Sequence, residues 1–151
     1  MIPLARVAQP AAIAVLRQAT ALKPKRKKAS DGLLPSKAHI NQNPNSDHNS
    51  GFAVDLTHDP DCGIDCYEIY EKLKEDERVK YLIFSGKIWS LKEGERKYNG
   101  SNGHYKHLHI SIKDTSGNDT SPWFAWLGKP KAINKVKAKV KKKPKKEATN
   151  D

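Results

Sequence analysis

The chain has 151 residues, with 28 Lys and Arg against 17 Asp and Glu and a formal net charge of +11. This length allows one domain with a hydrophobic core of its own. A mean hydropathy of −0.79 and the lack of an apolar run of about twenty residues argue against a transmembrane helix. Residues 129–151 hold ten Lys against Glu147 and Asp151, so this segment carries +8 and the rest of the chain only +3. We therefore predict a folded domain at residues 1–128 and a Lys-rich, disordered tail at residues 129–151.

The first predicted element is an Ala-rich helix over residues 10–22, which begins with a proline. Its larger apolar residues lie near helical spacing and would dock on the domain: Ile13, Leu16 and Leu22. We do not expect a cleaved secretory signal, because four residues interrupt the apolar run, namely Gln9, Pro10, Arg17 and Gln18.

A short basic segment follows at residues 23–28 and ends at the turn signal Ser30-Asp31-Gly32. One interpretation of this segment is a solvated loop. The other assigns Arg26 to a carboxylate of a substrate, because a guanidinium offers a fixed fork of two N–H donors.

Residues 46–57 read Ser-Asp-His-Asn-Ser-Gly-Phe-Ala-Val-Asp-Leu-Thr. From Phe52 onward the alternation predicts a strand, with Asp55 on the face opposite to its buried residues, Phe52, Val54 and Leu56. His48 precedes Asp55 by seven residues, across a turn rich in small and polar residues. The chain can therefore fold back and bring imidazole and carboxylate to the same point.

The segment from Asp59 to Asp65 has acidic residues at spacings that resemble a calcium loop, but the twelfth position holds Tyr70 instead of Glu. Cys62 and Cys66 are too few for a disulfide scaffold and lack the usual zinc-knuckle spacing. Free thiols and one local bridge are both compatible with their positions.

Four further elements are predicted before the end of the domain. Residues 65–77 form a helix capped by Asp65, with Ile69 and Leu73 on its apolar face. Residues 79–84 and 87–90 form a hairpin across Ser85-Gly86, and residues 92–103 form a flexible rim. Residues 121–126 bring aromatic bulk, for which packing is a better interpretation than stacking on a substrate.

The stretch His-Tyr-Lys-His-Leu-His-Ile-Ser-Ile, residues 104–112, predicts a strand with two different faces. Leu108, Ile110 and Ile112 would face the core, whereas the polar face carries His107, His109 and Ser111. Two imidazoles on one face can converge on a divalent metal. The predicted ligands are His48, Asp55 and His109, and three N, N and O ligands with one position left for water are typical of a catalytic zinc site.

The runs Ser46-x-His48-x-x-Gly51-x-Ala53-x-Asp55 and His107-x-His109 resemble the zinc signature of the M15-type D-Ala-D-Ala and L-Ala-D-Glu metallopeptidases. The similarity is nearest to the M15-like domains of bacteriophage endolysins and covers roughly residues 10–126. It implies an α+β fold of the hedgehog-like zinc peptidase type, with a small antiparallel sheet flanked by helices. It also implies that His48, Asp55 and His109 bind Zn²⁺ and that His107 is an unligated active-site residue.

The catalytic base departs from one branch of this family. In the dipeptidases an acidic residue lies three positions before the ligand histidine, where this chain has Lys106. His104-x-x-His107-x-His109 instead resembles the arrangement of penicillin-insensitive murein endopeptidases. This favours His107 as the general base, with His104 as a second base or as a donor to the oxyanion. Arg26 and Ser46 are the predicted substrate-binding residues.

The expected function is hydrolysis of a peptide bond in peptidoglycan stem peptides by a monomeric phage endolysin, held in the host cytoplasm until lysis. The tail could attract anionic wall polymers or lipid headgroups. An alternative is a catalytically silent, zinc-containing wall-binding module. A nucleic-acid-binding protein is a third interpretation, although no aromatic residues lie between the lysines. The residues do not distinguish L-Ala-D-Glu cleavage from D-Ala-diaminopimelate cleavage.

Overall fold

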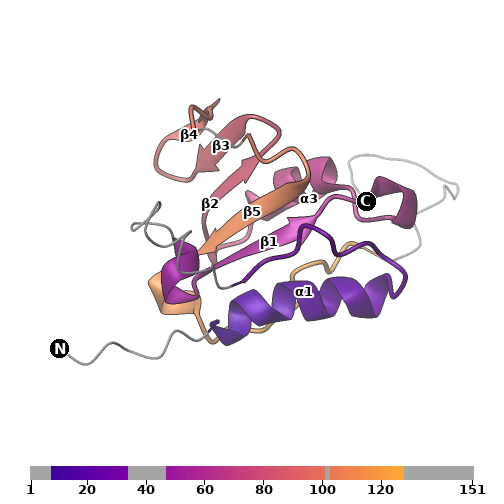
Figure 1. Ribbon diagram of the computed structural model, residues 1–151. Coiled ribbons are helices and arrows are strands. Elements are labelled where there is room, and N and C mark those ends of the chain that lie inside the picture. The colour runs from indigo at the N-terminus through magenta and orange to yellow at the C-terminus, as the bar shows by residue number, and fades with distance from the viewer. Residues whose placement is uncertain (1–7, 34–46, 101–102, 128–151) are drawn as a thin grey trace, which may run out of the picture.

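The computed structural model describes residues 8–33, 47–100 and 103–127, and within them the protein is an α+β domain with one antiparallel sheet (Figure 1). Its strands are β1 (Ala53–Thr57), β2 (Val79–Phe84), β3 (Lys87–Ser90), β4 (Gly94–Lys97) and β5 (His107–Ile112). Its helices are α1 (Pro10–Leu22) and α3 (Cys66–Leu73), and short 3-10 turns lie at η1 (Asp47–Ser50), η2 (Pro60–Cys62) and η3 (Asp114–Ser116). The Lys-rich segment 129–151 lies outside the described residues.

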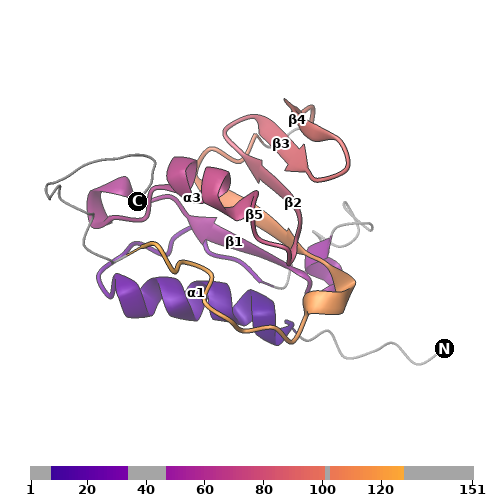
Figure 2. The same ribbon diagram turned by 180° about the vertical axis from the view of Figure 1, so that it is seen from behind.

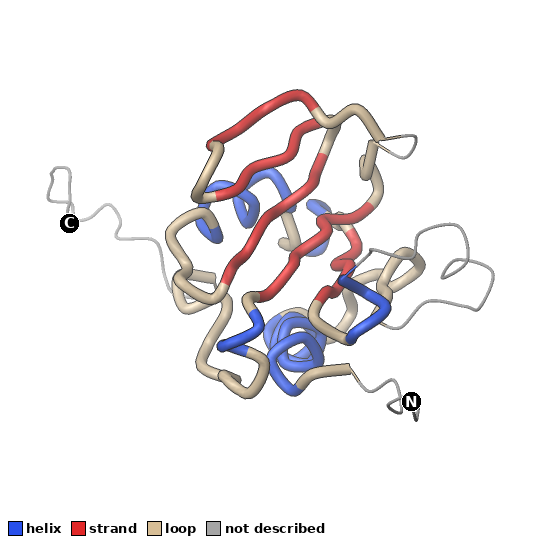
Figure 3. The backbone as a smooth tube through the Cα atoms, turned by 90° about the vertical axis from the view of Figure 1, so that its left-hand side faces the viewer, coloured by secondary structure: helices blue, strands red, loops and turns tan. Residues whose placement is uncertain are grey.

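The strand order in the sheet is β1-β5-β2-β3-β4, so β5 lies between β1 and β2 although it comes last in the chain. Figure 3 shows the strands side by side. The predicted hairpin of β2 and β3 is confirmed, and Ser85 and Gly86 have the positive φ angles, 51° and 79°, that its tight turn requires. This order places the His-rich β5 near the centre of the sheet and beside Asp55.

Both helices contribute to one hydrophobic core, together with alternate residues of the three strands nearest to them. α3 lies behind the sheet in Figure 1 and in front of it in Figure 2. The predicted inward residues of β5 are all fully buried in this core: Leu108, Ile110 and Ile112. The opposite side of β5 is therefore the side that remains for polar chemistry.

α1 has the predicted bounds, but its buried face is not the predicted one. Ala11, Val15 and Ala19 are fully buried, whereas Leu22 is 39% exposed and Ile13 and Leu16 are only half-buried. Small side chains let the helix lie close to β1, so the Ala face packs inward and the larger residues remain at the margin.

α3 is capped as predicted, because the Asp65 carboxylate accepts a hydrogen bond from the Tyr67 N–H at 2.9 Å. The helix ends at Leu73, earlier than predicted. The Asp76 carboxylate accepts the Arg78 N–H at 3.0 Å, and this local bond competes with continued helix.

Two further expectations need correction. The predicted rim contains β4, which pairs with β3, so Gly94–Lys97 is an edge strand within the segment expected to be a loop. β5 begins at His107, because His104 has a φ of 59° in the turn that precedes the strand.

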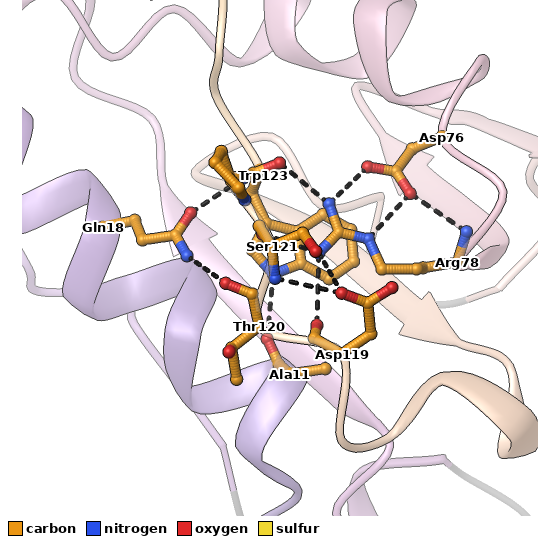
Figure 4. A network of polar contacts seen from close by, with 9 residues as sticks. Ala11, Gln18, Asp76, Arg78, Asp119, Thr120, Ser121 and Trp123 are labelled. Atoms are coloured by element: carbon orange, nitrogen blue, oxygen red, sulfur yellow. Dashed lines mark hydrogen bonds and ion pairs between the residues drawn. The ribbon is translucent and has the colours of Figure 1, made fainter.

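The aromatic C-terminal segment packs on the core, as predicted (Figure 4). The Trp123 indole Nε1–H donates to the Ala11 carbonyl at 3.0 Å, and the guanidinium carbon of Arg78 lies 3.6 Å from the centre of the Trp123 ring. Arg78 also donates to the carbonyls of Ser121 and Pro122 at 2.7 and 3.0 Å. These contacts fasten the end of the domain to α1 and to the start of β2.

Candidate functional site

The polar face of β1 and β5 brings one carboxylate and two imidazoles together. Asp55 is the register partner of His109, and Thr57 is the partner of His107. Asp55 Oδ1 lies 3.4 Å from His109 Nδ1, and Asp55 Oδ2 lies 3.6 Å from His107 Nε2. The two carboxylate oxygens thus face different histidines, and the strand pairing itself sets this arrangement.

His109 is the most enclosed member of this cluster, with a side chain that is 5% exposed. Its Nε2 lies 2.8 Å from Ser111 Oγ, on the same face of β5. Its ring stacks on Tyr81 of β2, with centroids 5.3 Å apart and an interplanar angle of 14°. Packing and hydrogen bonding therefore fix the ring, so that Nδ1 is the nitrogen directed at Asp55.

His104 joins the same cluster from the turn before β5. Its ring centroid lies 5.0 Å from that of His107 and 5.8 Å from that of His109. Its carbonyl accepts the Ser85 N–H at 2.9 Å, which ties the turn to the β2–β3 hairpin, and Tyr98 contacts its ring edge-on. The two predicted catalytic histidines are thus neighbours, although their chemical roles remain predictions.

His48 lies on η1, directly before β1, and its side chain is outside the described residues. The turn is held in place by its neighbour Asp47, whose carbonyl accepts the Phe52 N–H at 3.0 Å. The Asp47 carboxylate also pairs with Lys80 at 3.1 Å. Ser46 lies outside the described residues, so its predicted substrate contact remains a prediction.

Arg26 is neither part of a solvated loop nor free to bind a substrate. The residue is 4% exposed, and Nη1 and Nη2 donate to the two carboxylate oxygens of Asp31 at 3.0 and 2.7 Å. The remaining N–H groups donate to Thr20 Oγ1 and to the carbonyls of Lys27 and Leu16. All five donors of the guanidinium are therefore used within the protein, and its role is structural.

The Arg26–Asp31 pair supports Asp55 from the outer side of β1. Asp31 Oδ1 accepts both the N–H and the hydroxyl of Thr57, at 3.0 and 2.7 Å. The next residue, Gly32, exchanges two backbone hydrogen bonds with Asp55, at 2.8 and 3.1 Å. A Cβ on Gly32 would lie 3.3 Å from Asp55 Oδ2, so a small residue is favoured beside this carboxylate.

Two carboxylates of the acidic segment after β1 have hydrogen-bond partners within the protein. The Asp59 carboxylate accepts the Lys27 N–H at 2.9 Å, and Asp65 caps α3. Gly63 adopts a left-handed conformation with φ 97° that closes the turn. Cys62 and Cys66 are free thiols, and burial raises the pKa of Cys66 to about 12, so this thiol is neutral.

The distance between Asp55 and His109 fits two neighbouring ligands of one metal ion. Zinc bonds of about 2.0–2.2 Å in a tetrahedron put adjacent ligand atoms about 3.3–3.5 Å apart, and Oδ1 and Nδ1 are separated by 3.4 Å. A direct charged hydrogen bond would be shorter, about 2.7–2.9 Å. Within residues 8–33, 47–100 and 103–127, no three His, Cys, Asp or Glu side chains form a metal-binding group. Two of the three predicted ligands are therefore brought together, and the third is His48.

Comparisons with protein families, with curated proteins and with solved structures found no match to this chain. None of the helices in the described part of the chain has the length and apolar character needed to cross a membrane.

Two supporting residues were not assigned a role from the sequence. Ser111 was identified only as a member of the polar face of β5, and Tyr81 only as part of a strand. The stacking of Tyr81 on His109 depends on the pairing of β2 with β5, which shifts by one residue between Val79 and Tyr81, whereas Ser111 contacts His109 within β5 itself. The period-two pattern of β5 signalled Ser111, but no local pattern signalled Tyr81.

Proposed function

We propose that this protein is a zinc-dependent peptidoglycan peptidase of the hedgehog-like type that acts as a phage endolysin. The observation that carries the proposal is the juxtaposition of Asp55, His107 and His109 on one face of β1 and β5. It coincides with the spacing of the motif that begins at Ser46, which is far more specific than a lone His-x-His pair.

His48, Asp55 and His109 would hold the zinc ion. When bound, zinc lowers the pKa of its water toward neutrality and polarises a peptide carbonyl. Asp55 faces His109 through Oδ1, which leaves Oδ2 facing His107. One oxygen of the Asp55 carboxylate thus faces the proposed ligand His109, and the other faces the proposed base His107.

His107 would accept the proton of the attacking water and return it to the leaving amine. Its side chain is 15% exposed, so it is open to substrate, and its Nε2 lies 3.6 Å from Asp55 Oδ2. His104, in ring contact with His107, would stabilise the oxyanion or replace His107 as the base. Lys106 stands where the dipeptidases have an acidic residue and offers no carboxylate base. The transfer of the proton from water and to the leaving amine would therefore fall to histidines.

The proposed substrate is a peptide bond in the stem peptide or the cross-link of peptidoglycan. The enzyme would remain in the host cytoplasm until lysis and would then act on the wall. The Lys-rich tail would hold it near anionic wall polymers or lipid headgroups.

The decisive experiment is digestion of purified sacculi, followed by mass spectrometry of the released muropeptides. We expect new amino termini at one type of bond, loss of activity with a chelator, and recovery with zinc. His107→Ala is the matched control, because it should remain folded and zinc-loaded. Zinc binding without any cleavage would instead indicate the silent wall-binding module.

A further inference from the structure

We propose that Ser111 is a positioning residue for His109 and that it assigns the Nδ1 atom of this histidine to the metal. The proposal rests on the zinc function proposed above and extends it to a residue without a previous role. Ser111 Oγ lies 2.8 Å from His109 Nε2, whereas Nδ1 is the ring atom that faces Asp55. With the Nε2 proton donated to Ser111, Nδ1 would be the ring atom whose lone pair binds a metal ion.

The line Ser111–His109–Asp55 resembles a serine hydrolase triad in its order of contacts, but burial excludes that chemistry. Ser111 is fully buried, so a substrate carbonyl cannot reach its hydroxyl. A nucleophilic serine needs an exposed oxygen beside an oxyanion site. The hydroxyl can therefore act only through the ring of His109.

Tyr81 packs beside the contact between Ser111 and His109. It is the strand partner of Ser111 on β5, and its ring stacks on His109. Ser111 thus lies beside both the histidine that it orients and the tyrosine on which that histidine stacks.

Ser90 provides a matched control, because it is the partner of Tyr81 on the opposite neighbouring strand, β3. Its hydroxyl accepts the Glu93 N–H at 3.2 Å. Ser111→Ala and Ser90→Ala therefore remove the same group from the two sides of Tyr81.

The test is zinc affinity by chelator competition, combined with long-range ¹⁵N–¹H spectra of the zinc-loaded protein. We expect His109 to carry its proton on Nε2 and Ser111→Ala to weaken zinc binding about tenfold to a hundredfold. Ser90→Ala should bind zinc like the wild type. Zinc on Nε2 of His109, or wild-type affinity in Ser111→Ala, would overturn the proposal.

A second measurement separates this proposal from the proposed function. In the metal-free protein, ¹³C relaxation at His109 Cδ2 should show ring motion in Ser111→Ala that is absent from the wild type and from Ser90→Ala. A wild type that takes up no zinc would refute the zinc function, and this relaxation contrast would still decide the positioning role. Equally rigid rings in all three folded proteins would refute that role.

Discussion

Asp55 and His109 are register partners on β1 and β5, and their facing side-chain atoms are 3.4 Å apart. A carboxylate and an imidazole at this distance can share one metal ion. We therefore expect Asp55→Ala, His109→Ala and His48→Ala each to lose bound zinc and activity, because one of three ligands is removed. Metal analysis after dialysis measures the loss, and full zinc occupancy in all three variants would disprove the ligand set.

His107 faces the second oxygen of the same carboxylate, and His107→Ala should keep its zinc. Its rate on muropeptides should fall at least about a hundredfold, because positioned proton transfer is typically worth that much. His104→Ala should lose less if it only polarises the oxyanion. Steady-state kinetics on a defined muropeptide will compare them, and an active His107→Ala beside an inactive His104→Ala would reverse the two roles.

The pairing of Arg26 with Asp31 predicts a defect in stability in place of a defect in substrate binding. Arg26→Ala should lower the free energy of unfolding by about 3–5 kcal/mol, because Asp31 loses its buried partner. Arg96→Ala is the control, since Arg96 pairs with Glu93 at the surface and should change stability by about 1 kcal/mol or less. Urea denaturation measures both, and unchanged stability in Arg26→Ala would restore the substrate role.

Burial of the Cys66 thiol predicts a loss of stability at alkaline pH. Its pKa is raised from 9.0 to about 12 in the folded protein, so the neutral thiol contributes stability that is fully present below pH 9. As pH rises from 9 toward 12, the unfolded chain releases a proton that the folded protein keeps. Stability from this group should then fall by about 1.4 kcal/mol per pH unit. Denaturation of wild type and Cys66→Ala across this range isolates the effect, and parallel pH profiles would contradict it.

The Lys-rich tail, residues 129–151, is predicted to act on wall binding through its charge alone. A chain that ends at Gly128 should keep its zinc, its thermal transition and its rate on soluble muropeptides. It should act more slowly than the full chain on sacculi at low salt, and the two should converge at high salt, because screening acts over about 8 Å at physiological ionic strength. Equal rates at every salt concentration would remove the proposed role, and loss of the thermal transition would move the domain boundary.

Local signals predicted much of this fold. Asp65 is predictable as a cap because its bond to the Tyr67 N–H lies within three residues, and Ser85-Gly86 is predictable as a turn because it separates two adjacent strand patterns. The alternation in β5 predicted its two faces correctly, because one face packs into the hydrophobic core and the other carries the polar side chains.

Features that depend on distant contacts were missed. The Ala-rich sequence of α1 could not show which face would approach β1 most closely. β4 has no apolar residue, so its pairing with β3 left no hydrophobic pattern to detect. In the candidate site, too, the residues with local signals were predicted and those that depend on distant contacts were missed. The sequence suggested Asp55, His107 and His109, whereas the role of Arg26 and the stacking of Tyr81 on His109 depend on partners brought together by the fold.

The two edges of the sheet differ, and each is closed to further strands. At β4, Gly94, Glu95, Arg96 and Lys97 present charge where another chain would need to pair. At β1, the outward backbone groups of Asp55 are bonded to Gly32, and the Thr57 N–H is bonded to Asp31. Edge-to-edge association of sheets, a common route to aggregation, is therefore disfavoured at both ends, including the end that holds the proposed ligand Asp55.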